Sequence, residues 1–179
     1  GSSIAAVALA GEGTGMERDY YMHRAVHAGD LESAAEIGGK AGERAVQALG
    51  ARKIKSQQVP ILFDRRVSGG LVGHLAGAIN GQSIARGTSF LRDSLGDQVF
   101  ADGIEIIDDP RRFRGLASAP FDGEGLPAEA LTLVAAGRLQ QWLLNLATAR
   151  QLGLESNGRG TRSIGAAPGV AVSYTHLRA

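Results

Sequence analysis

Cysteine is absent from the sequence, so disulfide bonds and thiolate metal ligands are excluded. An excess of charge of one sign is also lacking. The formal net charge is +1, which favours neither nucleic acid nor an anionic membrane as a partner. No apolar run reaches the roughly 18 residues that a membrane span needs. We expect no signal peptide either, and a cytoplasmic location.

Glycine, by contrast, is abundant. The chain has 26 glycines in 179 residues, too many for a simple helical bundle, and a hydrophobic content of 44% that can bury a core. Strand-like and helix-like segments alternate along it, so we expect an α/β (α+β) fold. The sequence has no initiating methionine and begins inside a predicted strand, and we therefore interpret it as a fragment.

The first fifty residues predict a strand hairpin followed by a helix. Residues 3–10 and 16–27 are typical of strands, and the glycine-rich segment between them is typical of a hairpin turn. Asp30 is the predicted N-cap, with a Ser33–Glu36 capping box behind it, for a helix that extends to about Leu49.

Two features of the hairpin could instead indicate a ligand site. The turn contains two glycines one residue apart, as phosphate-binding loops do, but Met16 replaces the third glycine and no helix follows. His23 and His27 share one face of the second strand. They would lie about 13 Å apart at about 3.3 Å per residue, too far to share a metal ion.

A glycine-striped helix is predicted over residues 66–90, after a basic connector at 51–58 and an apolar strand at 59–64. Its apolar residues recur at helical spacing. Four glycines form a second stripe on it: Gly69, Gly73, Gly77 and Gly81. Because a glycine inside a helix costs about 1 kcal/mol relative to alanine, the stripe predicts close packing by another backbone or by a ligand.

The rest of the chain predicts a mainly antiparallel sheet against which this helix packs. Strands are expected at 104–108, 131–135 and 139–144, with Trp142 in the core, and a short helix at 147–152. From Glu155 onward the sequence lacks periodicity and is typical of an exposed loop.

Candidate chemistry is sparse. Asp122 and Glu124 lie two residues apart in a glycine-containing loop and could bind a cation or act as an acid–base pair, but such carboxylates more often cap backbone N–H groups. His74 has no second histidine or adjacent glutamate that would make it a metal ligand. No G-x-S-x-G, P-loop or H-E-x-x-H motif occurs. The residues alone therefore indicate no catalytic centre.

Several segments share their order and spacing with one protein family. They are GEGTGMERDYY (11–21), ERAVQALGARK (43–53), QQVPILFD (57–64), HLAGAINGQSIARGTSFL (74–91), IIDDP (106–110), PFDGEG (120–125) and LLNLATARQLGLESNG (143–158). Through them the chain resembles the TldD/PmbA family, once called modulators of DNA gyrase.

The resemblance implies a pair of related subunits. The TldD-like subunit resembles a zinc metalloprotease with an H-E-x-x-x-H helix, and the PmbA-like subunit, also called TldE, lacks that motif. With the register anchored on Arg86-Gly-Thr-Ser89, the motif positions fall on Val72, Gly73 and Gly77. None of these can bind zinc or move a proton, so the chain resembles the PmbA/TldE partner, with no catalytic or metal-binding residue.

The implied function is that of a non-catalytic subunit. Its partner is a TldD-like subunit that holds the zinc, and the complex cleaves unfolded or extended peptides, including antitoxins and peptide-antibiotic precursors. His74, Arg86, Asp122 and Glu124 are then cavity-lining or structural, and no cofactor is expected in this chain. Two alternatives stay open: a self-sufficient peptide hydrolase that uses Asp122, Glu124 and His74, and a regulatory module that binds DNA gyrase.

The resemblance also implies a domain organisation. Residues 1–50 would end a central α/β domain, and 51–170 would begin a C-terminal domain. Residues 171–179 depart from the family pattern and resemble translated adaptor sequence, so we expect them to be non-native.

Overall fold

The chain begins with a β-hairpin whose side chains alternate between a half-buried face and an exposed face. In the computed structural model, which describes residues 1–174, strand β1 (Ser2–Ala10) pairs antiparallel with β2 (Glu17–Ala25). Ser2 lies opposite Ala25 and Ala10 opposite Glu17. A 3₁₀ turn, η1 (Gly13–Gly15), joins the strands, and Gly11 has φ +85°, a value that favours glycine. The predicted hairpin is confirmed.

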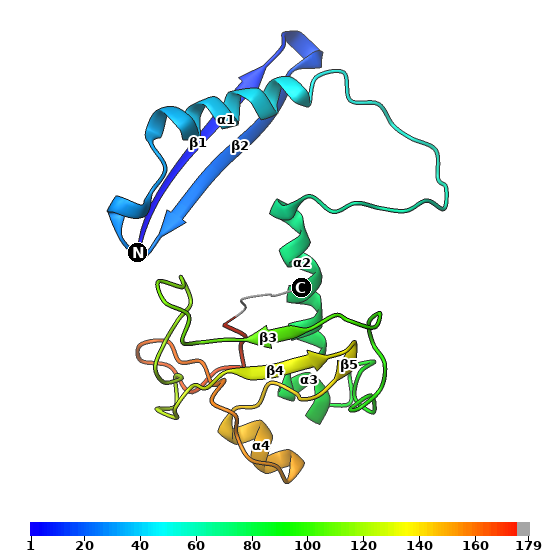
Figure 1. The fold of residues 1–179 in the computed structure, drawn as a ribbon, viewed down its shortest axis with the longest axis vertical. Helices are drawn as coiled ribbons and strands as arrows, with labels where there is room; N and C mark the ends of the chain where they lie inside the picture. Colours follow the sequence, from blue (N-terminus) through cyan, green and yellow to red (C-terminus); the bar gives the residue numbers. More distant parts are fainter. Residues whose placement is uncertain (175–179) are drawn as a thin grey trace. The chain divides into compact units, whose positions relative to one another are not determined.

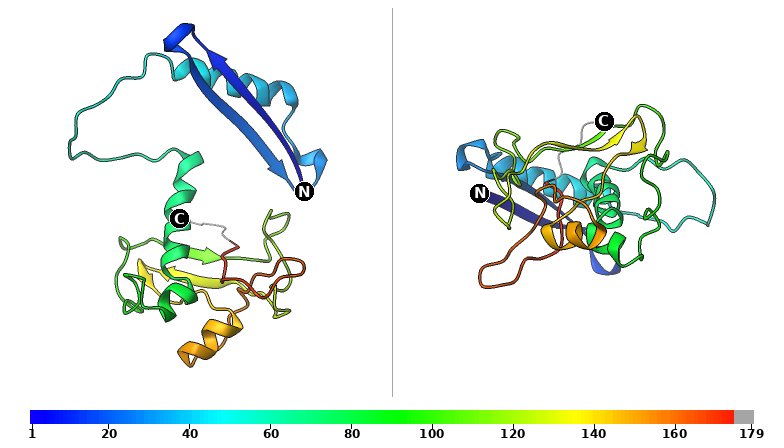
Figure 2. Two further views of the ribbon diagram at one scale, coloured as in Figure 1. Left: turned by 180° about the vertical axis from the view of Figure 1, so that it is seen from behind. Right: turned by 90° about the horizontal axis from the view of Figure 1, so that it is seen from below.

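Helix α1 (Ala34–Gln47) lies along one face of this hairpin (Figures 1 and 2). Its N-cap is Ser33, whose side chain accepts a hydrogen bond from Glu36 N while the Glu36 carboxylate accepts from Ser33, so the predicted capping box is confirmed. The predicted N-cap at Asp30 is wrong, because Asp30 ends a 3₁₀ turn, η2 (Ala28–Asp30), that precedes the helix. The side chains buried on this helix are those of Ile37, Ala41 and Ala45.

The connector from residue 51 to 64 forms no helix or strand, and the strand predicted at 59–64 is wrong. A strand is stabilised by ladder hydrogen bonds to a neighbour, and Pro60 has no N–H to donate. Within the described residues none of 51–63 takes part in a backbone ladder. The last residue, Asp64, instead caps the next helix by accepting a hydrogen bond from Arg66 N.

The predicted long helix is two helices. Helix α2 (Arg65–Ala78) ends at Ile79, and α3 (Gly81–Ala85) begins at once, with Asn80 as its N-cap. The break arises because Gly81 N donates to Leu143 O and Leu143 N donates to Ile79 O, so this backbone is tied to a distant segment. Helical periodicity alone does not reveal such a tie.

A three-stranded antiparallel sheet in the order β3-β4-β5 packs against α2. Its strands are β3 (Ile106–Asp108), β4 (Leu131–Ala135) and β5 (Arg138–Leu139). The turn between β4 and β5 requires Gly137, which has φ +76° and whose missing Cβ would lie 2.5 Å from Phe100 O. The mainly antiparallel sheet is confirmed, although β3 and β5 are shorter than the strands predicted at 104–108 and 139–144.

The core of this sheet and helix is apolar, and half-buried Trp142 packs against it. Its buried members are Val72, Leu75, Ile79, Leu91, Ile106, Leu133, Val134, Leu139, Leu143 and Ala171. Helix α4 (Leu146–Leu152) follows with Asn145 as N-cap, and Gly153 ends it in the left-handed conformation at φ +69°.

The C-terminal loop is less exposed than predicted. Gly158, Arg159 and Gly160 are buried. Ala171 accepts a hydrogen bond from Asn80 Nδ2 (2.6 Å), and Val172 N donates to Arg159 O (2.8 Å). The predicted non-native segment therefore begins with residues that pack on the core, and its part from 175 to 179 lies outside the described residues.

The chain divides into two compact units. The hairpin unit is Gly1–Ile61, and the pocket unit begins at Leu62. Across residues 1–174, none of the helices combines the length and the apolar character required to cross a membrane.

Candidate functional site

Helix α2 has two different faces. Val72 and Leu75 point into the core of the pocket unit, where their side chains are 8% and 6% exposed, and Ile79 follows them. Gly73, His74 and Gly77 are exposed. The helix is therefore fixed on one side by apolar packing, and the other side is left open.

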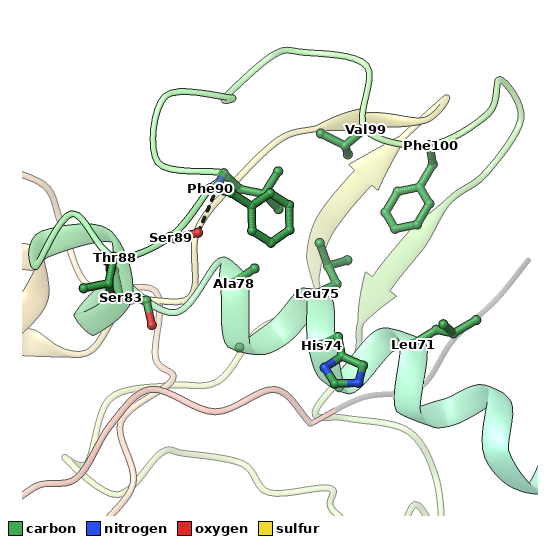
Figure 3. Close-up of a pocket in the computed structure, with 13 residues that line it drawn as sticks. Leu71, His74, Leu75, Ala78, Ser83, Thr88, Ser89, Phe90, Val99 and Phe100 are labelled. Atoms are coloured by element: carbon green, nitrogen blue, oxygen red, sulfur yellow. Dashed lines mark hydrogen bonds between the residues drawn. The ribbon is translucent and has the colours of Figure 1, made fainter.

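A pocket of about 600 Å³ lies along α2, lined by its exposed residues Gly73, His74 and Gly77 and by the edge of the core at Leu75 (Figure 3). The loop that follows α3 and the residues around Val99 form its other walls. Phe90, Val99 and Phe100 lie across the pocket from the helix, and Leu75 points toward them. The lining is Leu71, Gly73, His74, Leu75, Gly77, Ala78, Ser83, Thr88, Ser89, Phe90, Leu91, Val99 and Phe100. It is mostly apolar, with hydroxyl groups at one end, a composition typical of ligand pockets.

Two glycines of the stripe, Gly73 and Gly77, line this pocket. Among residues 1–174, a Cβ atom added at Gly69, Gly73 or Gly77 would meet nothing within 4 Å. The stripe was predicted to pack closely on another backbone or on a ligand. No described backbone of this chain lies close at these three glycines, and packing on a ligand or on a partner stays a prediction there. Close packing within the chain is found at Gly81, where an added Cβ would lie 2.6 Å from Thr148 Oγ1 and 2.9 Å from Leu143 O.

The positions of the expected zinc motif do not fit a metal. Val72 offers a hydrocarbon side chain to the core, and Gly73 and Gly77 have no side chain at all. Within residues 1–174, no three histidine, aspartate or glutamate side chains converge as a metal site would require. None of these three residues can bind zinc or act as a general base.

Of the other predicted site residues, only His74 lines the pocket. It is exposed on α2, near Leu71 (Figure 3). Arg86 is the exposed C-cap of α3, where its N–H donates to Gln82 O, and it is not part of the pocket lining.

Asp122 and Glu124 lie outside the pocket lining, in a loop beside α4. Asp122 is buried, and its carboxylate accepts hydrogen bonds from Glu124 N, Leu126 N and Gly160 N at 2.9, 2.9 and 2.7 Å. Glu124 Oε2 accepts from Leu146 N, the first residue of α4, at 2.8 Å. Both carboxylates thus hold backbone N–H groups.

The same loop packs tightly on residues 158–162. Gly123 N donates to Gly160 O, and a Cβ on Gly123 would overlap the backbone of Thr161 and Arg162. A Cβ on Gly160 would lie 2.7 Å from the Glu124 carboxylate. Gly123 and Gly160 therefore permit this contact, which holds the loop at 120–125 against the loop at 156–162.

A fully buried ion pair joins Asp108 and Arg159, and sequence reasoning missed it. Arg159 Nε donates to Asp108 Oδ2 at 2.6 Å, and both side chains are 0% exposed. Its other nitrogens donate to the carbonyls of Asn157, Gly158 and Glu129. Ser173 Oγ donates to Asp108 Oδ1. The pair fastens β3 to the C-terminal loop.

Tyr174 covers this pair. The Arg159 guanidinium lies 5.3 Å from the centre of the Tyr174 ring, within the range of a cation–π contact. Burial raises the pKa of the Tyr174 hydroxyl, and the nearby Arg159 charge opposes that rise. Arg159 stands in a glycine-rich run that is typical of a surface loop, so no local signal in the sequence reveals its burial.

Residues 56–179 match the family model described as the PmbA/TldA metallopeptidase C-terminal domain. The chain belongs to the PmbA/TldD metallopeptidase family. Metalloprotease PmbA of Escherichia coli O157:H7 is 40% identical over 156 residues, which is 87% of this chain and 35% of that protein. A PmbA homolog of Haemophilus influenzae is 33% identical over 156 residues, again 87% of this chain and 35% of the relative. The chain thus spans about a third of the length of these PmbA proteins.

Solved structures of the PmbA/TldD family share the fold. A Thermotoga maritima protein described as a modulator of a DNA gyrase superposes with a TM-score of 0.82 at 29% identity, covering 96% of this chain and 38% of that one. TldE from Thermococcus kodakarensis gives 0.67 at 22% identity, over 96% and 38% of the two chains, and shows the fold alone. The expected family and the α/β (α+β) fold are confirmed.

Proposed function

We propose that this chain is part of a non-catalytic, PmbA/TldE-like subunit of a TldD/TldE-type zinc metalloprotease. One observation carries the proposal. Where the resemblance expects the zinc motif, α2 has Val72, which points into the core, and two bare glycines, Gly73 and Gly77. Zinc hydrolysis needs ligands and a general base, and in this proposal a TldD-like partner subunit supplies them.

The role of this chain is then to complete the cavity in which an unfolded or extended peptide is cleaved. The pocket over α2 supports this role. It is mostly apolar, is open at Gly73 and Gly77, and lies on the helix where the resemblance places the positions of the zinc motif. Antitoxins and peptide-antibiotic precursors are the substrates that the resemblance implies.

The alternatives have less support. In a self-sufficient hydrolase, Asp122 and Glu124 would need free carboxylate oxygens facing a substrate. Both Asp122 oxygens and Glu124 Oε2 accept backbone hydrogen bonds instead. A gyrase-binding module is suggested by the older name of the family and by the description of the Thermotoga maritima protein. The net charge of +1 gives no added reason to expect a DNA-associated partner.

The test uses the intact protein, purified alone and together with a TldD-like subunit. Alone, it should bind no stoichiometric zinc by elemental analysis and should not cleave an unstructured peptide. Cleavage should appear with the partner and should disappear when the partner's zinc-binding histidines are replaced. Stoichiometric zinc or peptidase activity in the isolated protein would overturn the proposal.

A further inference from the structure

Two of the three asparagines of the chain are followed by glycine. They are Asn80, the N-cap of α3, and Asn157, in the loop after α4, whereas Asn145 is followed by leucine. Asparagine is a thermolabile residue. It is most reactive before glycine, because a residue without a Cβ leaves its backbone nitrogen unobstructed. The two Asn–Gly dipeptides are therefore candidate sites of spontaneous deamidation.

Deamidation begins when the backbone nitrogen after the asparagine attacks the side-chain amide carbon. A bond forms between that nitrogen and Cγ, the bond from Cγ to Nδ2 breaks, and the proton of the attacking nitrogen leaves with Nδ2 as ammonia. Water then opens the resulting cyclic imide to aspartate or isoaspartate. A hydrogen bond that holds the attacking N–H opposes this reaction, because the bond must break first.

At Asn80 the attacking nitrogen is firmly held. Gly81 is buried, and its N–H donates to Leu143 O at 2.8 Å. The cap conformation of Asn80, with ψ 128°, turns this nitrogen away from the side-chain carbon. The side chain is fixed as well, because its Nδ2 donates to Ala171 O at 2.6 Å and its Oδ1 accepts from Gln82 N at 3.0 Å. The fold therefore protects Asn80.

At Asn157 the attacking nitrogen is held only weakly. Gly158 N donates to Ser156 Oγ at the long distance of 3.4 Å, and among residues 1–174 no backbone carbonyl accepts from it. The Asn157 amide holds two other backbone groups: Nδ2 donates to Trp142 O at 2.7 Å, and Oδ1 accepts from Leu144 N at 2.8 Å. These two bonds orient the side chain, but they leave the Gly158 nitrogen without a strong acceptor.

The packing of the loop requires glycine after Asn157. Gly158 has φ +68°, and a Cβ added there would overlap Pro127 O. Asn157 itself is required for the hydrogen bonds to residues 142 and 144. The reactive dipeptide is thus a consequence of how this loop packs.

We propose that Asn157 is the site at which the folded protein deamidates, and that Asn80 reacts only after Asn157 has changed. Conversion of Asn157 removes the hydrogen bond to Trp142 O and places a carboxylate oxygen against that carbonyl. Leu143 lies between the two residues that Asn157 holds, and its carbonyl is the acceptor that protects Gly81 N. A change at residue 157 therefore loosens the segment that protects Asn80. The reaction needs water and no partner, so it is independent of the proposed function.

Ageing of the intact protein at mildly alkaline pH, followed by trypsin digestion and mass spectrometry, tests the proposal. The tryptic peptides 67–86, 139–150 and 151–159 contain one asparagine each, namely Asn80, Asn145 and Asn157. Conversion at Asn157 should be at least about tenfold faster than at Asn80, because the stronger hydrogen bond at Gly81 must open first. In urea the two Asn–Gly dipeptides should react at similar rates, and Asn145 should be slow in both conditions.

The Asn157→Asp variant, which carries one of the two products, tests the order of the reactions. Deamidation of Asn80 in the folded variant should be at least about threefold faster than in the wild type, because its protection is weakened. Gln151→Glu makes the same change from amide to carboxylate at an exposed position of α4, and this control should leave the rate at Asn80 unchanged.

Equal rates at Asn80 and Asn157 in the folded wild type, or faster conversion at Asn80, would overturn the proposal. Conversion at Asn157 that is no faster than at Asn145 would do the same. An unchanged rate at Asn80 in a folded Asn157→Asp variant would overturn the order. If that variant does not fold, the comparison of the wild-type peptides decides alone.

Discussion

At the scale of single residues, two arginine–carboxylate pairs in the pocket unit lie in opposite environments. The Asp108–Arg159 pair is fully buried, whereas Arg111 and Glu129 are 2.7 Å apart with side chains that are 50% and 73% exposed. A buried charge that loses its partner is left in a medium that solvates it poorly, whereas an exposed charge is solvated by water. The two N–O distances are similar, at 2.6 and 2.7 Å, but we expect the loss of the buried pair to lower the free energy of unfolding much more than the loss of the exposed pair.

Arg159→Leu should lower the free energy of unfolding by about 3–5 kcal/mol, because it leaves the Asp108 carboxylate buried and removes the hydrogen bonds to four backbone carbonyls. Denaturant unfolding followed by the fluorescence of Trp142, the only tryptophan of the chain, reports on this unit. Glu129→Ala removes the exposed pair and leaves the backbone carbonyl of residue 129 in place, so it should cost less than about 1 kcal/mol. Equal losses in the two variants would contradict the prediction.

Two glycines of the stripe should respond in opposite directions to the same substitution. Gly73→Ala should stabilise the protein by up to about 1 kcal/mol, since alanine is the better helix former and its Cβ enters open space. Gly81→Ala should destabilise it by about 1–3 kcal/mol, since the new Cβ would overlap Thr148 and Leu143 O. Thermal unfolding of the two variants measures the difference.

Gly77→Leu separates folding from assembly. The Cβ of the new side chain would enter the pocket and meet no atom of residues 1–174 within 4 Å, so the melting temperature of the isolated protein should not fall. A loss of binding to the TldD-like subunit or to an extended peptide would then show that this part of the pocket is used in the complex. A variant that unfolds more easily would contradict the open space seen at this position.

At the scale of elements, α1 is held on its hairpin by a small polar cluster as well as by its apolar face. Lys40 donates to Glu32 at 2.7 Å, Tyr21 Oη donates to the other Glu32 oxygen, and Glu32 N donates to His23 Nδ1. Lys40 and Arg44 also lie 4.8 and 4.6 Å from the centre of the Tyr21 ring. The hydrogen bond from Lys40 lowers the pKa of Glu32 and raises that of Lys40.

Protonation of Glu32 at acid pH should weaken the packing of α1 on the hairpin. Because the folded state lowers the pKa of this carboxyl from 4.5, its contribution is fully present above pH 4.5 and is lost as the pH falls through the lower folded value. Protection of the α1 amides in hydrogen exchange should therefore decrease below that pH. Glu32→Gln should remove this part of the pH dependence, whereas Glu43→Gln, at an exposed position of the same helix, should retain it.

The sequence predicted those elements whose signals are local. The Ser33–Glu36 capping box, the turn at Gly137 and the helix end at Gly153 each depend on residues a few positions apart. The strand at 59–64 and the unbroken helix were wrong because pairing and helix termination depend on distant backbone, such as Leu143 for α3. The pocket and the burial of Arg159 depend on contacts between segments that no local pattern encodes.

At the scale of the whole molecule, the connector is the most exposed part of the described chain. Leu62 is 101% exposed and Ile61 70%, and residues 51–63 form no backbone ladder among the described residues. Exposed backbone without hydrogen bonds opens readily to proteases. The two compact units should therefore separate by cleavage before either is digested internally.

Limited trypsin treatment should cut first after Arg52, Lys53 or Lys55, which are exposed in the connector. Mass spectrometry of the earliest fragments should then identify an intact hairpin unit and an intact pocket unit. Cleavage after buried Arg159 should come much later. Early cuts inside α1, at Lys40 or Arg44, would contradict the division into two units.

The Val72 side chain points into the core, and this limits how substitutions could create a metal site on α2. The resemblance places the zinc motif at residues 72, 73 and 77. Substitutions at Gly73 and Gly77 would place new side chains in an open pocket. A histidine at residue 72 would instead be buried among the apolar residues of the core, where an unpaired imidazole is costly. Catalytic ability in this chain would therefore require rebuilding the core beneath α2, and three substitutions alone would not restore a metalloprotease.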